Sequence, residues 1–261
     1  MAGRNHDIQL LRDLAAPPHR AILSLRLPLG RVAVGALIAS AFALALSMAM
    51  PWVAEFWSRQ LVWWMTALEL PGQFELARVG RPDLFSLPVP LIDARLNLIS
   101  MSGLVAHGLA AAALWWLAGC WPDHAKPGAF LLRFAVLLHA AAVAYFMVWP
   151  ASFPHAVAGH VSGGLRQTWA LMLVTPWLHL LTFYLFPFPA WQGTLLTALT
   201  LLYLVLLAPL QYATHVALLV LAGPVLMPLL YMLFGVMVPI LGIVALYGWG
   251  MSWRHPVAAN T

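Results

Sequence analysis

Long runs of uncharged, apolar residues are the feature of this sequence that most limits what it can fold into. The first run, residues 32–50, contains no charged side chain. As a helix it is long enough to cross a hydrocarbon core of roughly 30 Å. Hydrophobic residues make up 63% of the chain and charged residues only 8%, whereas an average soluble domain has about 25% charged residues. So few charges cannot cover a soluble surface, and the sequence therefore predicts an all-α polytopic membrane protein.

The same pattern places further spans along the chain. Apolar runs with at most one charge predict membrane-spanning helices over residues 98–116, 129–148 and 168–186. The last part, residues 193–253, can be divided in two ways. Two long helices that break at Gly223-Pro224 give six spans, which is the division that we favour. Three shorter helices, with a turn at residues 211–215, give seven.

Residues 51–97 are the longest polar stretch and are predicted to form an outer loop with structure of its own. Residues 52–70 mix five aromatic side chains with charged ones, a pattern typical of a helix that lies in the membrane interface. Two short strands are predicted to follow, Phe74–Arg78 and Leu84–Val89, with a turn between them. Prolines at the second strand predict a small sheet.

The distribution of charge predicts the orientation of the chain. Five arginines precede the first span, and basic residues beside spans are retained on the cytoplasmic side. We therefore expect a multi-pass protein of a bacterial inner (cytoplasmic) membrane with a cytoplasmic N-terminus. The predicted organisation is a basic N-terminal tail (1–31), a single membrane domain (32–253) that contains the outer loop module 51–97, and a C-terminal tail (254–261).

Histidines inside the predicted spans are the candidate cofactor ligands. A polar ring at this depth is costly without a partner, and two histidines on facing helices can ligate a b-type haem. In the alternative, which we favour, neutral imidazoles hydrogen-bond across helices to Ser, Thr or carbonyl groups. We thus expect no cofactor, with haem b as the other interpretation. The candidate ligands are His107, His139, His179 and His215.

A second outer loop is predicted over residues 149–167. It contains His155, His160, Ser162 and Arg166. A five-residue spacing does not place two histidines on one helical face, and no carboxylate is nearby to bind a hard cation. We therefore expect no metal site here and predict that these side chains are solvated.

Side chains able to break bonds are few. No carboxylate follows Asp123 in the sequence, and the single cysteine, Cys120, is predicted at the inner end of its span. One cysteine excludes an intrachain disulfide and a cysteine-based metal cage. The sequence therefore predicts no catalytic residues, and it favours a protein that is not an enzyme without deciding the matter.

The order of elements over residues 32–166 resembles that of the bacterial exosortases, which process sorted surface proteins. In that family the second span opens with a Cys-Ser-Gly-Leu-like nucleophile element, whereas this chain reads Ser100-Met101-Ser102-Gly103-Leu104. The resemblance implies an outer arginine and histidine, for which Arg166 with His155 or His160 would serve. Because a methionine stands where the thiol would be, it implies a non-catalytic relative or an associated protein.

These observations predict a non-enzymatic accessory or partner subunit of a surface-protein or polymer export or assembly system. Its expected partners are the lipid bilayer and either a second membrane protein or another copy of the chain. The basic net charge is explained by topology and does not indicate nucleic-acid binding. The alternative function is a membrane redox subunit that holds b-type haem through the four candidate histidines.

Overall fold

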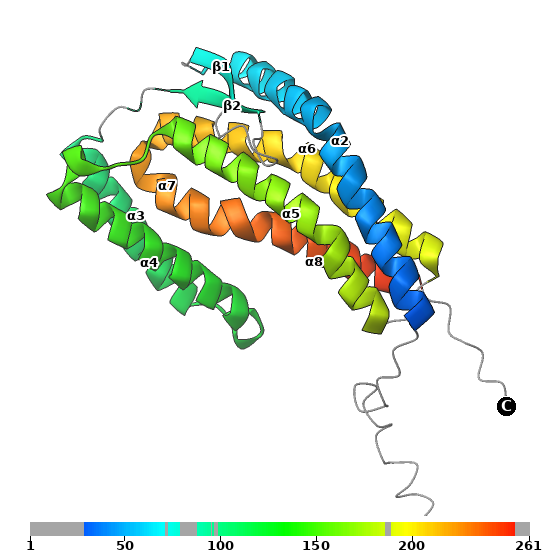
Figure 1. Cartoon of the computed structure of the whole chain (residues 1–261). Coiled ribbons are helices and arrows are strands. Elements are labelled where there is room, and N and C mark those ends of the chain that lie inside the picture. Colours follow the sequence, from blue (N-terminus) through cyan, green and yellow to red (C-terminus); the bar gives the residue numbers. More distant parts are fainter. Residues whose placement is uncertain are drawn as a thin grey trace, which may run out of the picture.

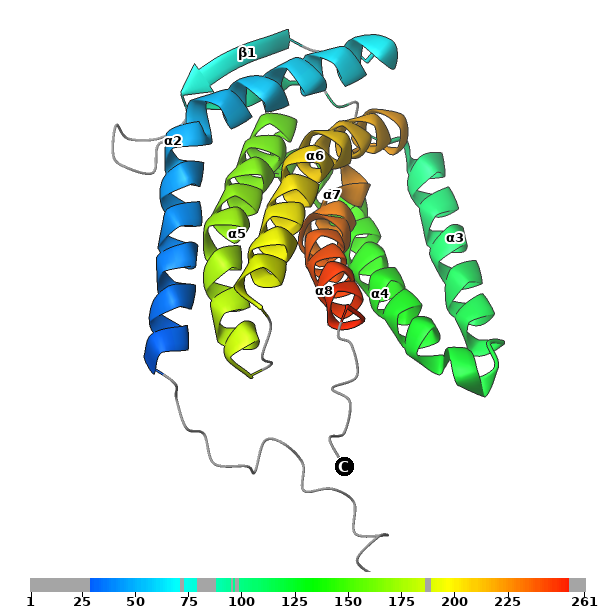
Figure 2. The ribbon, with the colours of Figure 1, turned by 90° about the vertical axis from the view of Figure 1, so that its right-hand side faces the viewer.

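The computed structural model describes residues 29–70, 73–78, 88–94, 96, 99–185 and 189–253, and most of these residues are helical (Figure 1). The long helices run up and down beside one another, as Figure 2 shows. They are α2 (Leu29–Ala67), α3 (Met101–Gly119), α4 (Lys126–Val148), α5 (Val157–Leu185), α6 (Ala190–Ala222) and α8 (Val238–Met251). Short helical turns precede α4 and α5, namely η1 (Asp123–Ala125) and η2 (Pro150–Ser152).

Among the described residues, five helical segments are long and apolar enough to cross a membrane. They are Val32–Ala67, Met101–Gly119, Asp123–Val148, Ala190–Ala222 and Pro224–Met251. The remaining long helix, α5, has 29 residues and lies within the same bundle (Figure 2). The prediction of a nearly all-helical, multi-pass architecture is thus supported by the structure.

The last part of the chain is divided at Gly223-Pro224, as the favoured six-helix division predicts. Gly223 has φ 78°, a left-handed conformation that glycine adopts without steric cost, and Pro224 opens the next segment. That segment runs through η3 (Pro224–Leu226), α7 (Met227–Leu229) and the π-helix η4 (Leu230–Met237) into α8. The polar patch at residues 211–215 lies inside α6 and makes no turn.

Helix α2 continues through Pro51 and changes direction near its middle, so that its second half lies across one end of the bundle (Figure 2). The predicted interfacial helix is therefore the second half of α2 and not a separate element. Its buried face carries Trp57, Leu61 and Met65, each 0% exposed, at the four-residue spacing of one helical side. Trp52 and Trp63 are exposed on the other side.

A two-stranded antiparallel sheet follows α2, formed by β1 (Gln73–Arg78) and β2 (Pro88–Asp93) with Phe74 opposite Ile92. The first strand begins one residue before the predicted Phe74–Arg78. The second begins at Pro88 and runs to Asp93, so it lies later than the predicted Leu84–Val89, of which residues 84–87 fall outside the described chain. Ile92 is 0% exposed and belongs to the main hydrophobic core. We call the second half of α2 with this sheet the roof.

Two hydrophobic clusters hold the bundle together. The larger joins the roof, α5, α6 and the start of η4, and α6 lies at its centre. The smaller joins α3 and α4 to Val225 of η3 through Leu104, Val143 and Phe146. The α3–α4 hairpin is therefore attached to the rest mainly near the roof, and in Figure 1 it lies to one side of the other helices. The start of α2 and the end of α8 lie at the end of the bundle opposite the roof, which we call the termini end (Figure 2).

Candidate functional site

Buried polar side chains are concentrated between α5 and α6, which lie side by side in both views (Figures 1 and 2). Among the described residues, every buried Ser, Thr, His and Gln side chain belongs to one of these two helices. We call this set the α5–α6 seam. It comprises His160, Ser162, Thr168, Thr175 and His179 of α5, and Thr197, Thr200, Gln211 and His215 of α6.

The roof end of the seam is a pair of histidines. His160 Nε2 lies 3.1 Å from His215 Nδ1, so one of the two neutral rings donates a proton and the other accepts it. The side chains are 6% and 2% exposed. The ring of Tyr212 is centred 5.2 Å from that of His215, and the ring of Tyr231 is centred 6.1 Å from that of His160. In the described part of the chain, His215 Nε2 has no hydrogen-bond partner.

The termini end of the seam is a histidine–threonine pair. Thr197 Oγ1 donates to the carbonyl of Gly193 at 2.8 Å, which uses its one proton. His179 Nδ1 lies 2.9 Å from the same oxygen, and Nδ1 must therefore carry the proton that it donates to Thr197. The ring of Tyr247 from α8 is centred 6.4 Å from that of His179.

Hydroxyl groups lie between these two ends. Thr168, Thr175 and Thr200 donate to carbonyls one turn earlier in their own helices, at 3.1, 2.7 and 2.8 Å. This bonding satisfies each hydroxyl proton and leaves the oxygen free to accept. The ring of Tyr212 reaches across from α6 and lies directly against Gly164 of α5. The seam therefore offers a series of acceptors with a histidine at each end.

The four histidines named from the sequence do not meet at one point. His107 Nδ1 and His139 Nε2 are 3.2 Å apart between α3 and α4, while His179 and His215 occupy opposite ends of the seam. When two imidazoles bind a metal ion from opposite sides, with bonds of about 2.0–2.1 Å, the two ligand nitrogens are about 4 Å apart. In the structure each of these rings instead bonds to a side chain of a neighbouring helix. Within the described residues, no group of three or more His, Cys, Asp or Glu side chains is placed to hold a metal ion.

The prediction of a loop over residues 149–167 is wrong for most of its length, because α5 begins at Val157. His160 is not solvated: it is a buried member of the seam, bonded to a residue 55 positions away. Ser162 is also buried. His155 and Arg166 do remain exposed, and Arg166 Nε donates to the Ser162 carbonyl at 3.2 Å.

The serine-rich element at the start of α3 has a local structural role. The Ser100 hydroxyl accepts the backbone N–H of Gly103 at 3.2 Å and thereby caps the helix, which serines commonly do at this position. Ser102 Oγ lies 3.0 Å from Ser100 Oγ. Cys120 is exposed at the other end of α3, so a whole helix separates it from this element.

Known proteins give no further guide to the site. No protein-family model matches the chain, and neither does any curated protein or solved structure. The resemblance to exosortases therefore depends on the order of elements and on residues 100–104. Function has to be argued from the seam and from one further surface feature.

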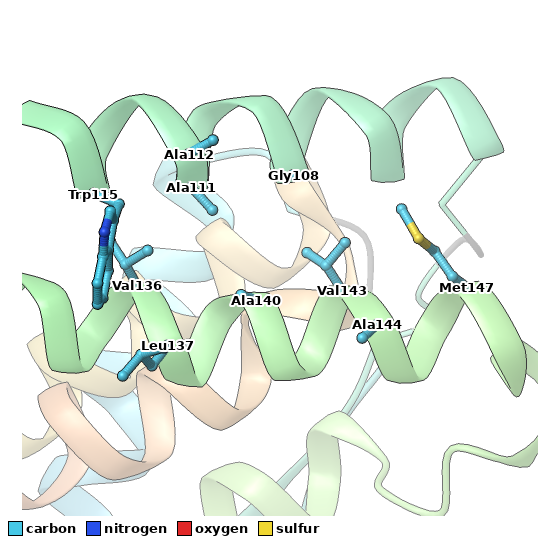
Figure 3. A pocket seen from close by; sticks show the side chains of 10 residues that line it. All are labelled: Gly108, Ala111, Ala112, Trp115, Val136, Leu137, Ala140, Val143, Ala144 and Met147. Carbon is cyan, nitrogen blue, oxygen red and sulfur yellow. The ribbon is translucent and has the colours of Figure 1, made fainter.

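That feature is a groove between α3 and α4, with a volume of about 420 Å³ (Figure 3). Its middle is lined by small residues spaced four apart on each helix: Gly108 and Ala112 on α3, Ala140 and Ala144 on α4. Trp115 and Met147 lie toward its two ends in Figure 3. Small residues at this spacing leave the helix backbone accessible to another helix.

Proposed function

We propose that the chain is a non-enzymatic, multi-pass subunit of a bacterial inner membrane that binds a second membrane protein. In this proposal it serves as an accessory or partner subunit of a surface-protein or polymer export or assembly system, and its N-terminus is cytoplasmic. The observation that carries the proposal is the α3–α4 groove. Its occupant would be a transmembrane helix of the partner protein.

The lining of the groove favours a helix as occupant. Helix association in lipid depends on close packing, because apolar side chains gain little by leaving lipid tails. Gly108 and Ala112 on one wall, with Ala140 and Ala144 on the other, allow a third backbone to approach both helices. A partner helix with its own small residues would then pack at a short distance along about two turns.

The surroundings of the groove also favour a partner. The hairpin exposes large apolar side chains along its length, among them Leu109 at 67%, Trp116 at 71% and Phe130 at 75%. Its contacts with the rest of the chain are concentrated near the roof. Helices with such open sides lie against lipid or against another protein, and the groove marks the side where a protein would fit.

The arrangement of the ends supports the proposed orientation. The start of α2 and the end of α8 lie at the termini end, as does the α3–α4 turn with Lys126 (Figure 2). With the arginine-rich N-terminal tail in the cytoplasm, basic residues of the termini end would follow the positive-inside tendency. The roof, with its exposed Trp52 and Trp63, would then face outward at headgroup depth.

The test places a photo-crosslinking amino acid in the groove at Ala112 and, as a matched control, at Ala110, which is exposed on the same helix but does not line the groove. The proposal predicts one discrete protein adduct from position 112 and none from position 110. A second substitution on the facing wall, Ala144→Leu, fills the groove and should abolish the adduct, whereas Ala141→Leu, at an exposed position outside the groove, should not.

Four results would contradict the proposal. Crosslinking only to lipid would make the groove an acyl-chain site. An adduct of twice the chain mass of 28.6 kDa would indicate a second copy of the chain. Equal crosslinking from positions 110 and 112, or an adduct insensitive to Ala144→Leu, would mean that the groove does not select its neighbour.

A further inference from the structure

We propose that the α5–α6 seam is a proton relay that connects the two sides of the membrane. The inference rests on which residues are buried, where they lie along two adjacent helices, and how their protons are placed. It does not depend on the partner helix proposed above, because the α3–α4 groove lies outside the seam.

The seam has the length that such a relay needs. His160 and His179 on α5 are separated by roughly 28 Å at 1.5 Å per residue, and the hydrocarbon core of a bilayer is roughly 30 Å thick. On α6, Thr197 and His215 are separated by a similar rise. The histidines therefore lie near the two edges of the hydrocarbon core. In the described part of the chain, the buried threonine hydroxyls at positions 168, 175 and 200 lie between them.

The histidine pair at the roof end can pass a proton by changing tautomers. His160 accepts a proton at Nδ1 and gives up the proton of Nε2 to His215 Nδ1, 3.1 Å away. His215 then releases its own Nε2 proton, so both rings stay neutral overall. His155 is exposed at this end, five residues before His160. Because His215 Nε2 has no partner among the described residues, it is available to pass the proton on.

The middle and far parts of the seam supply acceptors. The oxygens of Thr168, Thr175 and Thr200 have given their own protons to the backbone and can accept from water molecules placed between them. At the termini end, His179 donates through Nδ1 to Thr197. When His179 takes up a proton from the seam, it releases its Nδ1 proton to a water molecule on that side, with the ring turned away from Thr197, because the Thr197 oxygen keeps its own hydrogen bonded to Gly193.

A relay also explains why these polar groups are buried at all. A polar group inside a membrane is costly and is generally retained for function, and the described residues of α2, α3, α4 and α8 bury no Ser, Thr, His or Gln side chain to the same degree. The seam carries no buried carboxylate, lysine or arginine in its described length. It could therefore move a proton without fixing a permanent charge in the core.

The experiment uses the full chain reconstituted into vesicles of phosphatidylethanolamine and phosphatidylglycerol that contain the pH dye pyranine. A potassium gradient with valinomycin makes the interior negative and draws protons inward. We expect the wild-type chain to acidify the interior faster than empty vesicles do. His215→Gln keeps a hydrogen-bonding side chain but cannot relay a proton, and it should reduce the rate to that of empty vesicles. His107→Gln, in the α3–α4 hairpin, should leave the wild-type rate.

A second pair of variants keeps the test valid if His215→Gln fails to fold. Thr200→Val preserves the shape of a 0%-exposed seam residue and should slow acidification. Thr214→Val alters an exposed threonine of the same helix, whose hydroxyl bonds only to Leu210, and should not. Wild-type flux no faster than that of empty vesicles would overturn the proposal. So would equal losses in Thr200→Val and Thr214→Val, or in His215→Gln and His107→Gln.

Discussion

Trp57 in the roof donates its indole N–H to the backbone carbonyl of Val205 in α6, at 2.9 Å. Val205 is the residue whose carbonyl would normally accept from position 209, and Pro209 has no N–H to give. This hydrogen bond links the roof to α6, and it uses the carbonyl that has no partner within the helix because of Pro209. The side chain of Trp57 is 0% exposed, so an unpaired carbonyl at this contact would have no water to replace the bond.

This relationship predicts a specific double-mutant result. Trp57→Phe removes the donor and should lower the free energy of unfolding in detergent by about 1–3 kcal/mol for the orphaned carbonyl, in addition to lost packing. Pro209→Ala restores the backbone N–H, so the cost of Trp57→Phe should be smaller in that background. Trp63→Phe, at an exposed site, is the control. An equal cost of Trp57→Phe in both backgrounds would refute the explanation.

Gln211 plays a similar part at the π-helix η4. Its Nε2 donates to the carbonyls of Phe234 at 2.8 Å and Gly235 at 3.4 Å. Pro239 lies four residues after Gly235 and five after Phe234, so it can pair with neither carbonyl in an α- or a π-helical pattern. We expect Gln211→Leu to lower the unfolding free energy by about 1–3 kcal/mol and Pro239→Ala to recover part of it. A chemical denaturation series on the four proteins measures this, and an unchanged midpoint for Gln211→Leu would argue against it.

Two adjacent glycines of α5 should respond in opposite ways to the same substitution. A methyl group on Gly164 would collide with the ring of Tyr212, whereas a methyl group on Gly163 would meet nothing within 4 Å. Gly163→Ala is therefore expected to stabilise the helix by about 0.5–1 kcal/mol. Gly164→Ala should lower the melting temperature, because α5 and α6 must move apart. Similar melting temperatures for the two variants would show that the helices are not packed this closely.

The absorption spectrum of the purified protein tests the haem alternative. Each candidate histidine is hydrogen-bonded to a neighbouring side chain, in the pairs His107–His139, His160–His215 and His179–Thr197. We therefore expect no Soret band after expression with excess haem. A Soret band that disappears in His139→Ala would instead establish a redox subunit.

Much of the architecture could be predicted because it depends on local features of the sequence. Uncharged runs located the helices, and Gly223-Pro224 correctly marked the break before the last segment. The aromatic and charged residues of 52–70 also predict the interfacial helix, but as an element separate from the first span at residues 32–50. A proline removes one hydrogen bond and can bend a helix without ending it, and α2 therefore continues through Pro51.

The candidate site could be predicted only in part because it depends on contacts between distant residues. The run from Gly159 to Thr168 is rich in polar and small residues, which is typical of a loop, and nothing local indicates burial. His160 is buried because His215, on another helix, provides a partner. The sequence placed His107, His139 and His179 in the spans, and hydrogen bonding across helices was the favoured interpretation. Their actual partners could not be inferred from single-residue positions.

The number of membrane crossings is the claim on which the rest depends, and labelling with a membrane-impermeant maleimide tests it most directly. Three sites suffice. The first is the native Cys120, which is exposed at the α3–α4 turn. The other two are Glu69→Cys, between α2 and the sheet of the roof, and Ser252→Cys, after α8, and each is introduced into a Cys120→Ser background. Six crossings predict that Cys120 and Ser252→Cys react only from the cytoplasmic side and Glu69→Cys only from the outside. Reaction of Ser252→Cys from the outside, or of Glu69→Cys and Cys120 from the same side, would contradict the account.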